Sequence, residues 1–169
     1  VDSGNILYQE KLTLDDKETT GTLTDKVAEL GAPLVLKVVN ELNNGTVNEV
    51  IQDHDKATFC TLIKKEHGLI DWNEPTVAIL NKIRAFNPWP LVQTKFNDKG
   101  LNIFEAVIAE SELNGRPGEV LEYNKQTGFL VKTGDGYISI LKLQLQSKKV
   151  LDYKSFNNGV KDFVGGVLG

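Results

Sequence analysis

The sequence predicts an α+β chain that is mostly β, with a small closed barrel in its C-terminal part. Two observations predict this. After residue 90 the chain divides into five short apolar segments separated by turn residues, whereas the first half holds one strand pattern and one long helical pattern. Five short strands at this spacing are typical of a Greek-key barrel of the oligonucleotide-binding (OB) type, in which closure removes the edge strands. A length of 169 residues allows one domain, or a small domain with part of another.

The first part of the chain predicts one strand followed by one helix. Residues 5–14 alternate apolar and polar side chains, as in a strand. Thr22 is the expected N-cap of a helix whose apolar residues recur every three or four positions until an Asn-Gly pair stops it. Gly31 and Pro33 interrupt the pattern, so we expect a kink or two abutting helices. One strand and one helix cannot enclose a core, and residues 1–45 are therefore expected to be a βα remnant of a larger domain.

A linker and a second helix are expected to follow. Residues 46–67 are polar and lack a regular period, which predicts an extended linker before a C-terminal domain at 68–169. Asn73 is the expected cap of the second helix, with Pro75 in its first turn, and an Asn-Pro pair is expected to end it.

The remaining chain predicts the barrel. Its strand segments are separated by Asn, Asp and Gly residues, which favour tight turns. A single helical turn is expected at 155–159. The predicted strands span residues 91–96, 101–109, 117–123, 127–132 and 136–143.

Charge divides the chain unevenly. The net charge is −4, but residues 1–61 carry 5 lysines against 11 acidic residues, whereas residues 62–169 carry 14 basic against 12 acidic residues. This gradient favours two structural units of different origin. The basic excess of the second part is small for a dedicated nucleic-acid-binding domain, because each neutralised phosphate needs a Lys or Arg.

Several classes of protein are excluded by composition. Cys60 has no second cysteine to pair with, and His54 and His67 have no ligand partners at zinc spacing, so we expect no disulfide and no metal. No apolar run approaches the roughly 18 residues of a membrane helix, and no leader peptide is recognisable, which favours a soluble cytoplasmic protein without a membrane partner. The chain contains no methionine and begins at Val1, so we expect a fragment of a longer protein.

Several motifs occur in the order found in one enzyme family. They are Val-Asp-Ser-Gly-Asn at residues 1–5, Ile-Asp-Trp at 70–72, the run IRAFNPWP at 83–90, Thr-Gly-Asp-Gly at 133–136 and Lys-Lys at 148–149. Together they resemble the C-terminal part of the methionyl-tRNA formyltransferase family, over nearly the whole chain. The run IRAFNPWP is the most specific of these signals, whereas Gly-Asp-Gly alone is weak.

The resemblance implies a fold, a reaction and partners. The fold is a Rossmann-like formyltransferase domain, a linker and an OB-like barrel. The reaction transfers a formyl group from 10-formyltetrahydrofolate to the amino group of methionyl initiator tRNA, in the bacterial cytoplasm or, in a eukaryote, in mitochondria or plastids. We expect a monomer that uses no metal. The resemblance identifies Asp2 with the family's catalytic Asp, whereas the partner Asn and His are absent from this sequence, so we expect no activity from this chain alone.

Six basic residues are candidates for contact with tRNA phosphates. Trp72 and Trp89 could stack on bases, but a Trp between two prolines at a helix end is suited to anchoring the helix, and we expect both indoles in the core. The basic candidates are Lys64, Lys65, Lys82, Arg84, Lys148 and Lys149.

Two alternatives remain open. A sibling enzyme would formylate a nucleotide sugar or hydrolyse formylfolate, and the Asn-Pro-Trp-Pro ending argues against it. The other alternative is a free-standing OB-like binding module without an active site. An Asn-x-His triplet and a Ser-Leu-Leu-Pro run about 35 residues before Asp2 would identify the enzyme.

Overall fold

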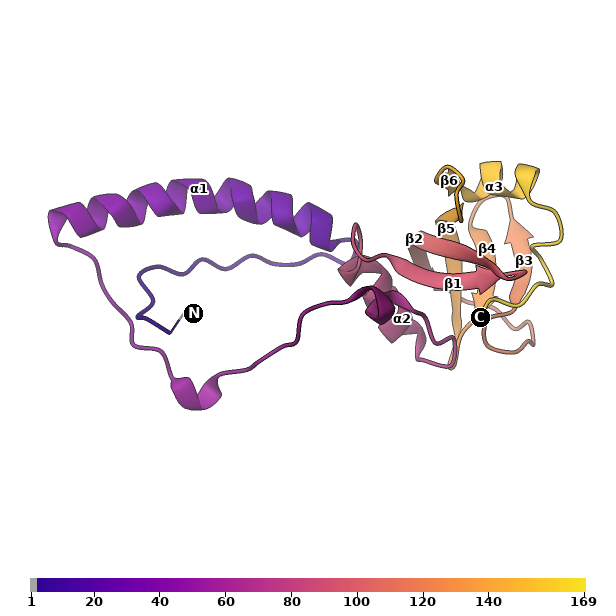
Figure 1. Cartoon of the computed structure of the whole chain (residues 1–169), viewed down its shortest axis with the longest axis horizontal. Helices are drawn as coiled ribbons and strands as arrows, with labels where there is room; N and C mark the ends of the chain where they lie inside the picture. Colours follow the sequence, from indigo (N-terminus) through magenta and orange to yellow (C-terminus); the bar gives the residue numbers. More distant parts are fainter. Residues whose placement is uncertain (1–2) are drawn as a thin grey trace. The chain divides into compact units, whose positions relative to one another are not determined.

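The computed structural model describes residues 3–169 and consists of two compact units (Figure 1). The first unit ends at Leu62, and the second spans Ile63–Gly169. Asp2, the expected catalytic residue, lies outside the described residues.

The first unit contains the predicted long helix, α1, at Thr20–Asn44. Its N-cap is Thr19 rather than Thr22: the Thr19 side chain accepts a hydrogen bond from the Thr22 amide, and Thr22 Oγ1 accepts one from the Thr19 amide at 3.0 Å. The expected cap was wrong because Thr22 is the third residue of the helix, the N3 position, where its side chain completes the capping box that Thr19 begins. Gly45 ends the helix in the left-handed conformation, with φ 67°.

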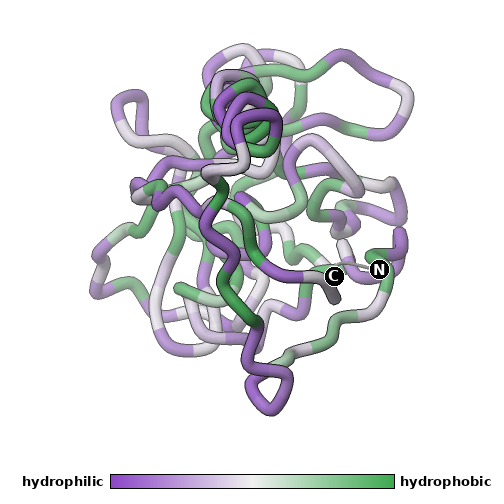
Figure 2. The backbone as a smooth tube through the Cα atoms, turned by 90° about the vertical axis from the view of Figure 1, so that its left-hand side faces the viewer, coloured by the Kyte–Doolittle hydropathy of each residue, from purple (hydrophilic) through white to green (hydrophobic). Residues whose placement is uncertain are grey.

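Helix α1 runs without a break through Pro33, so the expectation of two abutting helices was wrong (Figure 1). Pro33 has no N–H and cannot donate to the carbonyl four residues earlier, but the helix continues on both sides of it. No residue of α1 is buried, although apolar side chains such as Val35 and Leu36 lie along it. Figure 2 looks along α1, and the coil there carries both green apolar and purple polar residues.

The strand expected at residues 5–14 does not form. Only Ile6 is paired, in an antiparallel bridge with Val50 whose two N···O distances are 2.8 and 2.9 Å. An alternating pattern makes a strand only where a neighbouring strand supplies hydrogen bonds, and residues 7–14 have no such neighbour in the described chain. The segment after α1 contains a 3₁₀ turn, η1, at His54–Lys56.

The second unit contains all five predicted strands, each within three residues of its expected bounds. A two-residue strand, β6, was not predicted, and it leads directly into the expected C-terminal helical turn. The elements are η2 (Lys65–Gly68), α2 (Thr76–Ala85), β1 (Val92–Phe96), β2 (Lys99–Ala109), β3 (Val120–Asn124), β4 (Gly128–Lys132), β5 (Tyr137–Leu145), β6 (Leu151–Asp152) and α3 (Tyr153–Gly159).

The strands form one antiparallel sheet in the order β1-β2-β5-β4-β3, with β6 beside β5. The prediction of an α+β chain is confirmed, and its sheet is antiparallel, but the chain is not mostly β, because its helices are as extensive as its strands. The predicted closed barrel is not formed, because β1 and β3 do not pair with each other. An irregular segment lies along both edges instead. The Leu168 amide donates to the Gly118 carbonyl at 2.8 Å, and the Gly169 amide donates to the Lys95 carbonyl at 3.1 Å. In a closed barrel, these backbone groups would pair with a neighbouring strand. Here they form hydrogen bonds with the irregular C-terminal segment instead.

Four phenylalanines meet in the core of the second unit. Phe163 makes edge-to-face contacts with Phe96, Phe129 and Phe156 at ring-centroid distances of 4.9, 4.8 and 4.9 Å. Such contacts add to the stabilisation from apolar burial. Helix α2 packs mainly on β2 through its buried face.

Helix α2 is capped by a residue from a distant loop. The Asp135 carboxylate accepts hydrogen bonds from the Thr76 amide and hydroxyl, both at 2.7 Å. The expected cap, Asn73, was wrong, because its amide groups donate to Asp71 instead. The bond from the Thr76 amide holds the pKa of Asp135 below its usual value. The Thr-Gly-Asp-Gly motif therefore fastens the start of α2 to the sheet.

Candidate nucleic-acid interface

Lys64 and Lys65 lie at the 3₁₀ turn η2. The Lys64 ammonium is 3.8 Å from the Glu66 carboxylate, whereas Lys65 has no ion pair among residues 3–169. Both side chains are exposed. The Lys64 amide donates to His67 Nδ1 at 3.2 Å, which holds the turn together. Of the two, Lys65 is the more available to an anionic partner.

Lys82 and Arg84 lie on α2 and are held by neighbouring side chains. Lys82 Nζ is 2.8 Å from both carboxylate oxygens of Glu74, and Arg84 Nη2 donates to Asn81 Oδ1 at 2.6 Å. The Lys82 side chain is also largely buried, at 23% exposure. A phosphate would have to compete with Glu74 for Lys82, so this residue is the weakest of the six candidates.

Lys148 and Lys149 lie in the turn between β5 and β6. Both are exposed, and neither side chain has an ion pair or hydrogen bond among the described residues. The backbone of the turn is fixed, because the Lys148 carbonyl accepts from Gln144 Nε2 at 2.8 Å and its amide donates to the Leu145 carbonyl at 2.9 Å. The turn thus presents two free ammonium groups on an ordered backbone. The six candidates therefore lie on three elements: η2, α2 and this turn.

The two tryptophans have opposite environments. Trp72 is buried at 4% exposure, and its indole N–H donates to Thr94 Oγ1 at 3.1 Å, so the expected core position is confirmed. Trp89 is 59% exposed, and for this residue the expectation was wrong. The helix end is anchored by Pro90, which is buried, and by Asn87, which bonds the Phe104 carbonyl. The indole is not needed for that anchor and points outward.

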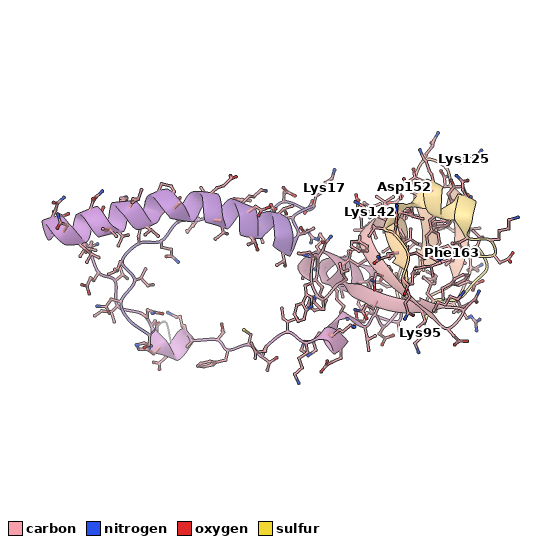
Figure 3. All side chains as sticks on the ribbon, turned by 45° about the horizontal axis from the view of Figure 1, so that its top comes forward. Lys17, Lys95, Lys125, Lys142, Asp152 and Phe163 are labelled. Carbon is pink, nitrogen blue, oxygen red and sulfur yellow. The ribbon has the colours of Figure 1, made fainter. Side chains whose placement is uncertain are left out.

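The second unit has further lysines that were not among the six predicted candidates (Figure 3). Lys99 and Lys161 line a cavity of about 290 Å³ together with the apolar side chains of Phe96, Leu145 and Val160. Lys99 and Lys161 are 62 positions apart in the sequence, so no local pattern could join them. Figure 3 labels Lys95, Lys125 and Lys142, and Lys142 is the cross-strand partner of Asp152.

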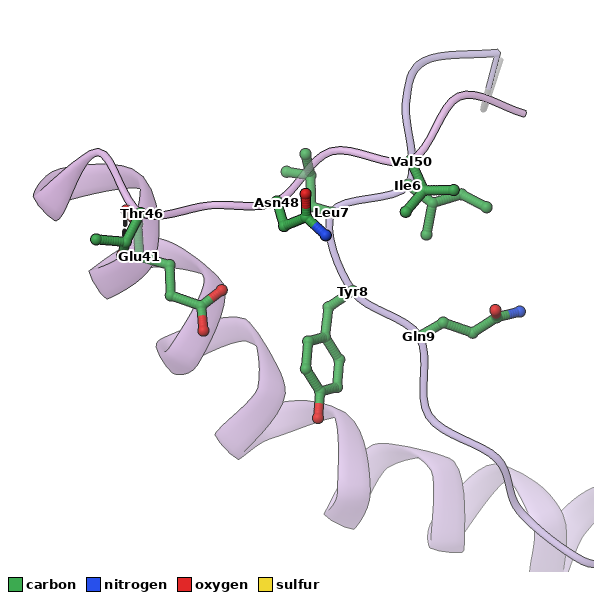
Figure 4. A pocket seen from close by; sticks show the side chains of 8 residues that line it. All are labelled: Ile6, Leu7, Tyr8, Gln9, Glu41, Thr46, Asn48 and Val50. Atoms are coloured by element: carbon green, nitrogen blue, oxygen red, sulfur yellow. Dashed lines mark hydrogen bonds between the residues drawn. The ribbon is translucent and has the colours of Figure 1, made fainter.

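The first unit holds a second cavity, of about 350 Å³ (Figure 4). The Tyr8 ring points toward α1, and the Lys37 ammonium lies 4.1 Å from the centre of that ring. The Glu41 carboxylate is 4.0 Å from the same ammonium. The cavity lining includes no histidine or cysteine, and its polar side chains are those of Tyr8, Gln9, Glu41, Thr46 and Asn48.

Residues 3–169 contain no group of three or more His, Cys, Asp or Glu side chains arranged to hold a metal ion. His54 lies in η1 and His67 in η2. Within the same residues, no helix combines the length and apolar character needed to cross a membrane.

Comparison with known proteins places these features among formyltransferases. Residues 62–161 match the family described as formyl transferase, C-terminal domain. The chain is 39% identical over 170 residues to a methionyl-tRNA formyltransferase of Treponema denticola, with 98% of this chain and 53% of that protein aligned. It is 36% identical over 170 residues to one of Borreliella burgdorferi, with 99% and 54% aligned. The chain thus spans about half the length of the curated relatives it matches.

Solved structures share the fold at lower identity. HypX from Aquifex aeolicus, crystallised in complex with tetrahydrofolic acid, matches with a TM-score of 0.70 at 21% identity, over 95% of this chain and 28% of that chain. The sugar 3N-formyl transferase WlaRD matches with a TM-score of 0.61 at 21% identity, over 88% and 52% of the two chains.

Proposed function

The chain belongs to the formyl transferase C-terminal domain family, and from this premise we propose that it is the tRNA-binding part of a methionyl-tRNA formyltransferase. That enzyme would transfer a formyl group from 10-formyltetrahydrofolate to methionyl initiator tRNA during translation initiation, as a cytoplasmic monomer. The observation that carries the proposal is the identity of 36–39% to enzymes of that name over nearly the whole chain. The sequence identity to the sugar formyltransferase structures is only 20–21%, which supports a common fold and nothing further.

The antiparallel sheet of the second unit is proposed to act as an open OB-like module that holds the tRNA backbone. Lys65, Lys148 and Lys149 are exposed and have no ion pair within residues 3–169, and they support this role because phosphate contacts need free cations. Phosphate contacts fix position and carry little sequence information. Discrimination of the initiator tRNA is therefore assigned to other parts of the enzyme.

Asp2 is proposed as one member of the catalytic set. When an amine attacks the formyl carbonyl, hydrogen-bond donors stabilise the oxyanion and a base accepts the ammonium proton. The 169 residues contain no Asn-x-His triplet and no Ser-Leu-Leu-Pro run, so the chain alone is expected to show no formyl transfer. In a longer protein that carries both motifs, Asp2→Asn should lower the rate by about 10²- to 10⁴-fold with little change in tRNA affinity. An unchanged rate would remove Asp2 from the catalytic set.

A salt titration tests the tRNA-binding role. We expect the chain to bind initiator and elongator tRNA with similar affinity, and we expect log affinity to fall linearly with log salt. The slope should be modest, because the second part of the chain has only two more basic than acidic residues. Filter binding between low and physiological salt measures the slope. Salt-independent binding, or a preference for initiator tRNA by this chain alone, would contradict the proposal.

A further inference from the structure

We propose that Trp89 is a stacking platform for an unpaired base of the bound RNA, beside phosphate contacts from η2. The inference rests on the proposed tRNA-binding function and names the kind of nucleotide that this surface holds. Its starting point is the 59% exposure of the Trp89 side chain, in a unit whose other tryptophan is almost fully buried.

The backbone on both sides of Trp89 is held in place. Asn87 Nδ2 donates to the Phe104 carbonyl at 3.1 Å, and the Leu91 amide donates to the Phe86 carbonyl at 2.9 Å. The carbonyl of buried Pro90 accepts from Gln93 Nε2 at 3.2 Å. These bonds fix the loop before any ligand arrives, so little backbone entropy is lost when a base stacks on the indole.

Leu91 adds a second sign that this loop is held in one conformation. Its φ is +69°, in the left-handed region that non-glycine residues seldom occupy. Strain of this kind persists only where the surrounding structure imposes it, and it is concentrated at functional sites. The left-handed Leu91 thus lies in the same bonded loop as the exposed Trp89.

The basic turn η2 packs against the same loop. A Cβ atom on Gly68 would lie 2.1 Å from the Leu91 carbonyl oxygen and 3.5 Å from Pro90 Cγ, so the two backbones are in direct contact. Lys64 and Lys65 belong to this turn, and Lys65 has no ion pair in the described chain. Within η2, Glu66 faces Lys64 at 3.8 Å.

The last turn of α2 precedes Trp89 in the chain. The Asn87 amide donates to the Arg84 carbonyl at 3.3 Å, so the loop follows directly from the end of the helix. An exposed aromatic ring in a loop that contacts a lysine-bearing turn suits a nucleotide, whose base stacks while its phosphates contact cations.

Substitution of Trp89 separates stacking from phosphate contact. Trp89→Ala should weaken tRNA binding by about tenfold, while Trp89→Phe keeps most of the affinity because it retains an aromatic face. The salt slope of Trp89→Ala should equal that of the unaltered chain, whereas Lys65→Ala should lower it by about one unit. Val77→Ala is the matched control, because Val77 is 56% exposed on the same unit.

Acrylamide quenching provides a measurement that needs no variant. Trp72 is buried, so quenching of the unaltered chain reports mainly on Trp89. Saturating tRNA should protect the indole, and a tRNA-sized DNA duplex with blunt ends should protect it less, because its bases are already stacked. Unchanged affinity of Trp89→Ala together with unprotected fluorescence would overturn the inference and leave tRNA binding by this chain intact. An unaltered chain that binds no tRNA at low salt would overturn both proposals.

Discussion

The two units use apolar residues in opposite ways. In the unit that ends at Leu62, a 25-residue helix has no buried residue, and Val35 and Leu36 are 63% and 67% exposed. In the unit that begins at Ile63, sheet and helices enclose a cluster of aromatic and aliphatic side chains. The difference shows that helical periodicity and caps define an element locally, whereas a core requires partners from distant parts of the chain.

Phe163 provides the strongest test of this comparison. Phe163→Ala removes three edge-to-face contacts and leaves a cavity, so we expect a loss of about 3–5 kcal/mol in the free energy of unfolding. Leu36→Ala, on the exposed helix, should change it by no more than about 0.5 kcal/mol. Urea denaturation measures the free energy of unfolding of both variants. Trp72 fluorescence follows the unfolding of Phe163→Ala, and circular dichroism follows that of Leu36→Ala. Equal losses would show that α1 is as well packed as the sheet.

A smaller effect is expected at Asp135, whose pKa is lowered mainly by the Thr76 amide. The pKa of an Asp carboxyl group in the unfolded chain is about 4. A carboxyl group whose pKa is lower in the folded state stabilises the protein at pH values above that unfolded value. This stabilisation is lost as the pH falls through the folded-state pKa. Asp135→Asn should therefore be destabilised at pH 7, and its difference from the unaltered chain should shrink on acidification. Thermal unfolding from pH 7 to pH 3 measures this difference. A difference that does not depend on pH would show that the ionised carboxylate is not what caps α2.

The smallest effects concern single lysines in tRNA binding. Lys149→Ala should lower the salt slope by about one unit, whereas Lys37→Ala, on the acidic first unit, should leave it unchanged. Lys82→Ala should have less effect than Lys149→Ala, because Glu74 already neutralises Lys82 at 2.8 Å. Filter binding over a range of salt concentrations compares the three variants. Equal slopes for Lys37→Ala and Lys149→Ala would show that tRNA does not distinguish the two units.

The elements that could be predicted from the sequence are those with local signals. Helix α1 and the five longer strands have clear periods and flanking turn residues, and all of them form. The strand at residues 5–14 has the period but lacks a neighbour, and the Thr76–Asp135 cap joins residues 59 positions apart. Neither outcome is visible in a short window of sequence.

The candidate site was predictable as a set of residue types but not as a surface. Local sequence identified Lys65 and Lys82 alike as candidates, and it placed Trp89 in the core. Only the fold distinguishes the free Lys65 from the neutralised Lys82. Trp89 can be exposed because other residues hold the loop after α2 in place. These are Pro90, which is buried, and Asn87, whose side-chain amide bonds the Phe104 carbonyl. Side-chain availability is a tertiary property, and residue type alone does not determine it.

The irregular segment along β1 and β3 has a consequence for solubility. An open sheet presents unpaired N–H and C=O groups at each edge, and such an edge is a template for pairing with a strand of another molecule. Here the carbonyl of Lys95 on one edge and the backbone of Gly118 beside the other are both occupied by residues 168–169. The segment thus protects the sheet from edge-to-edge aggregation. Removal of residues 168–169 would leave the Lys95 and Gly118 carbonyls without these partners and so expose part of each edge.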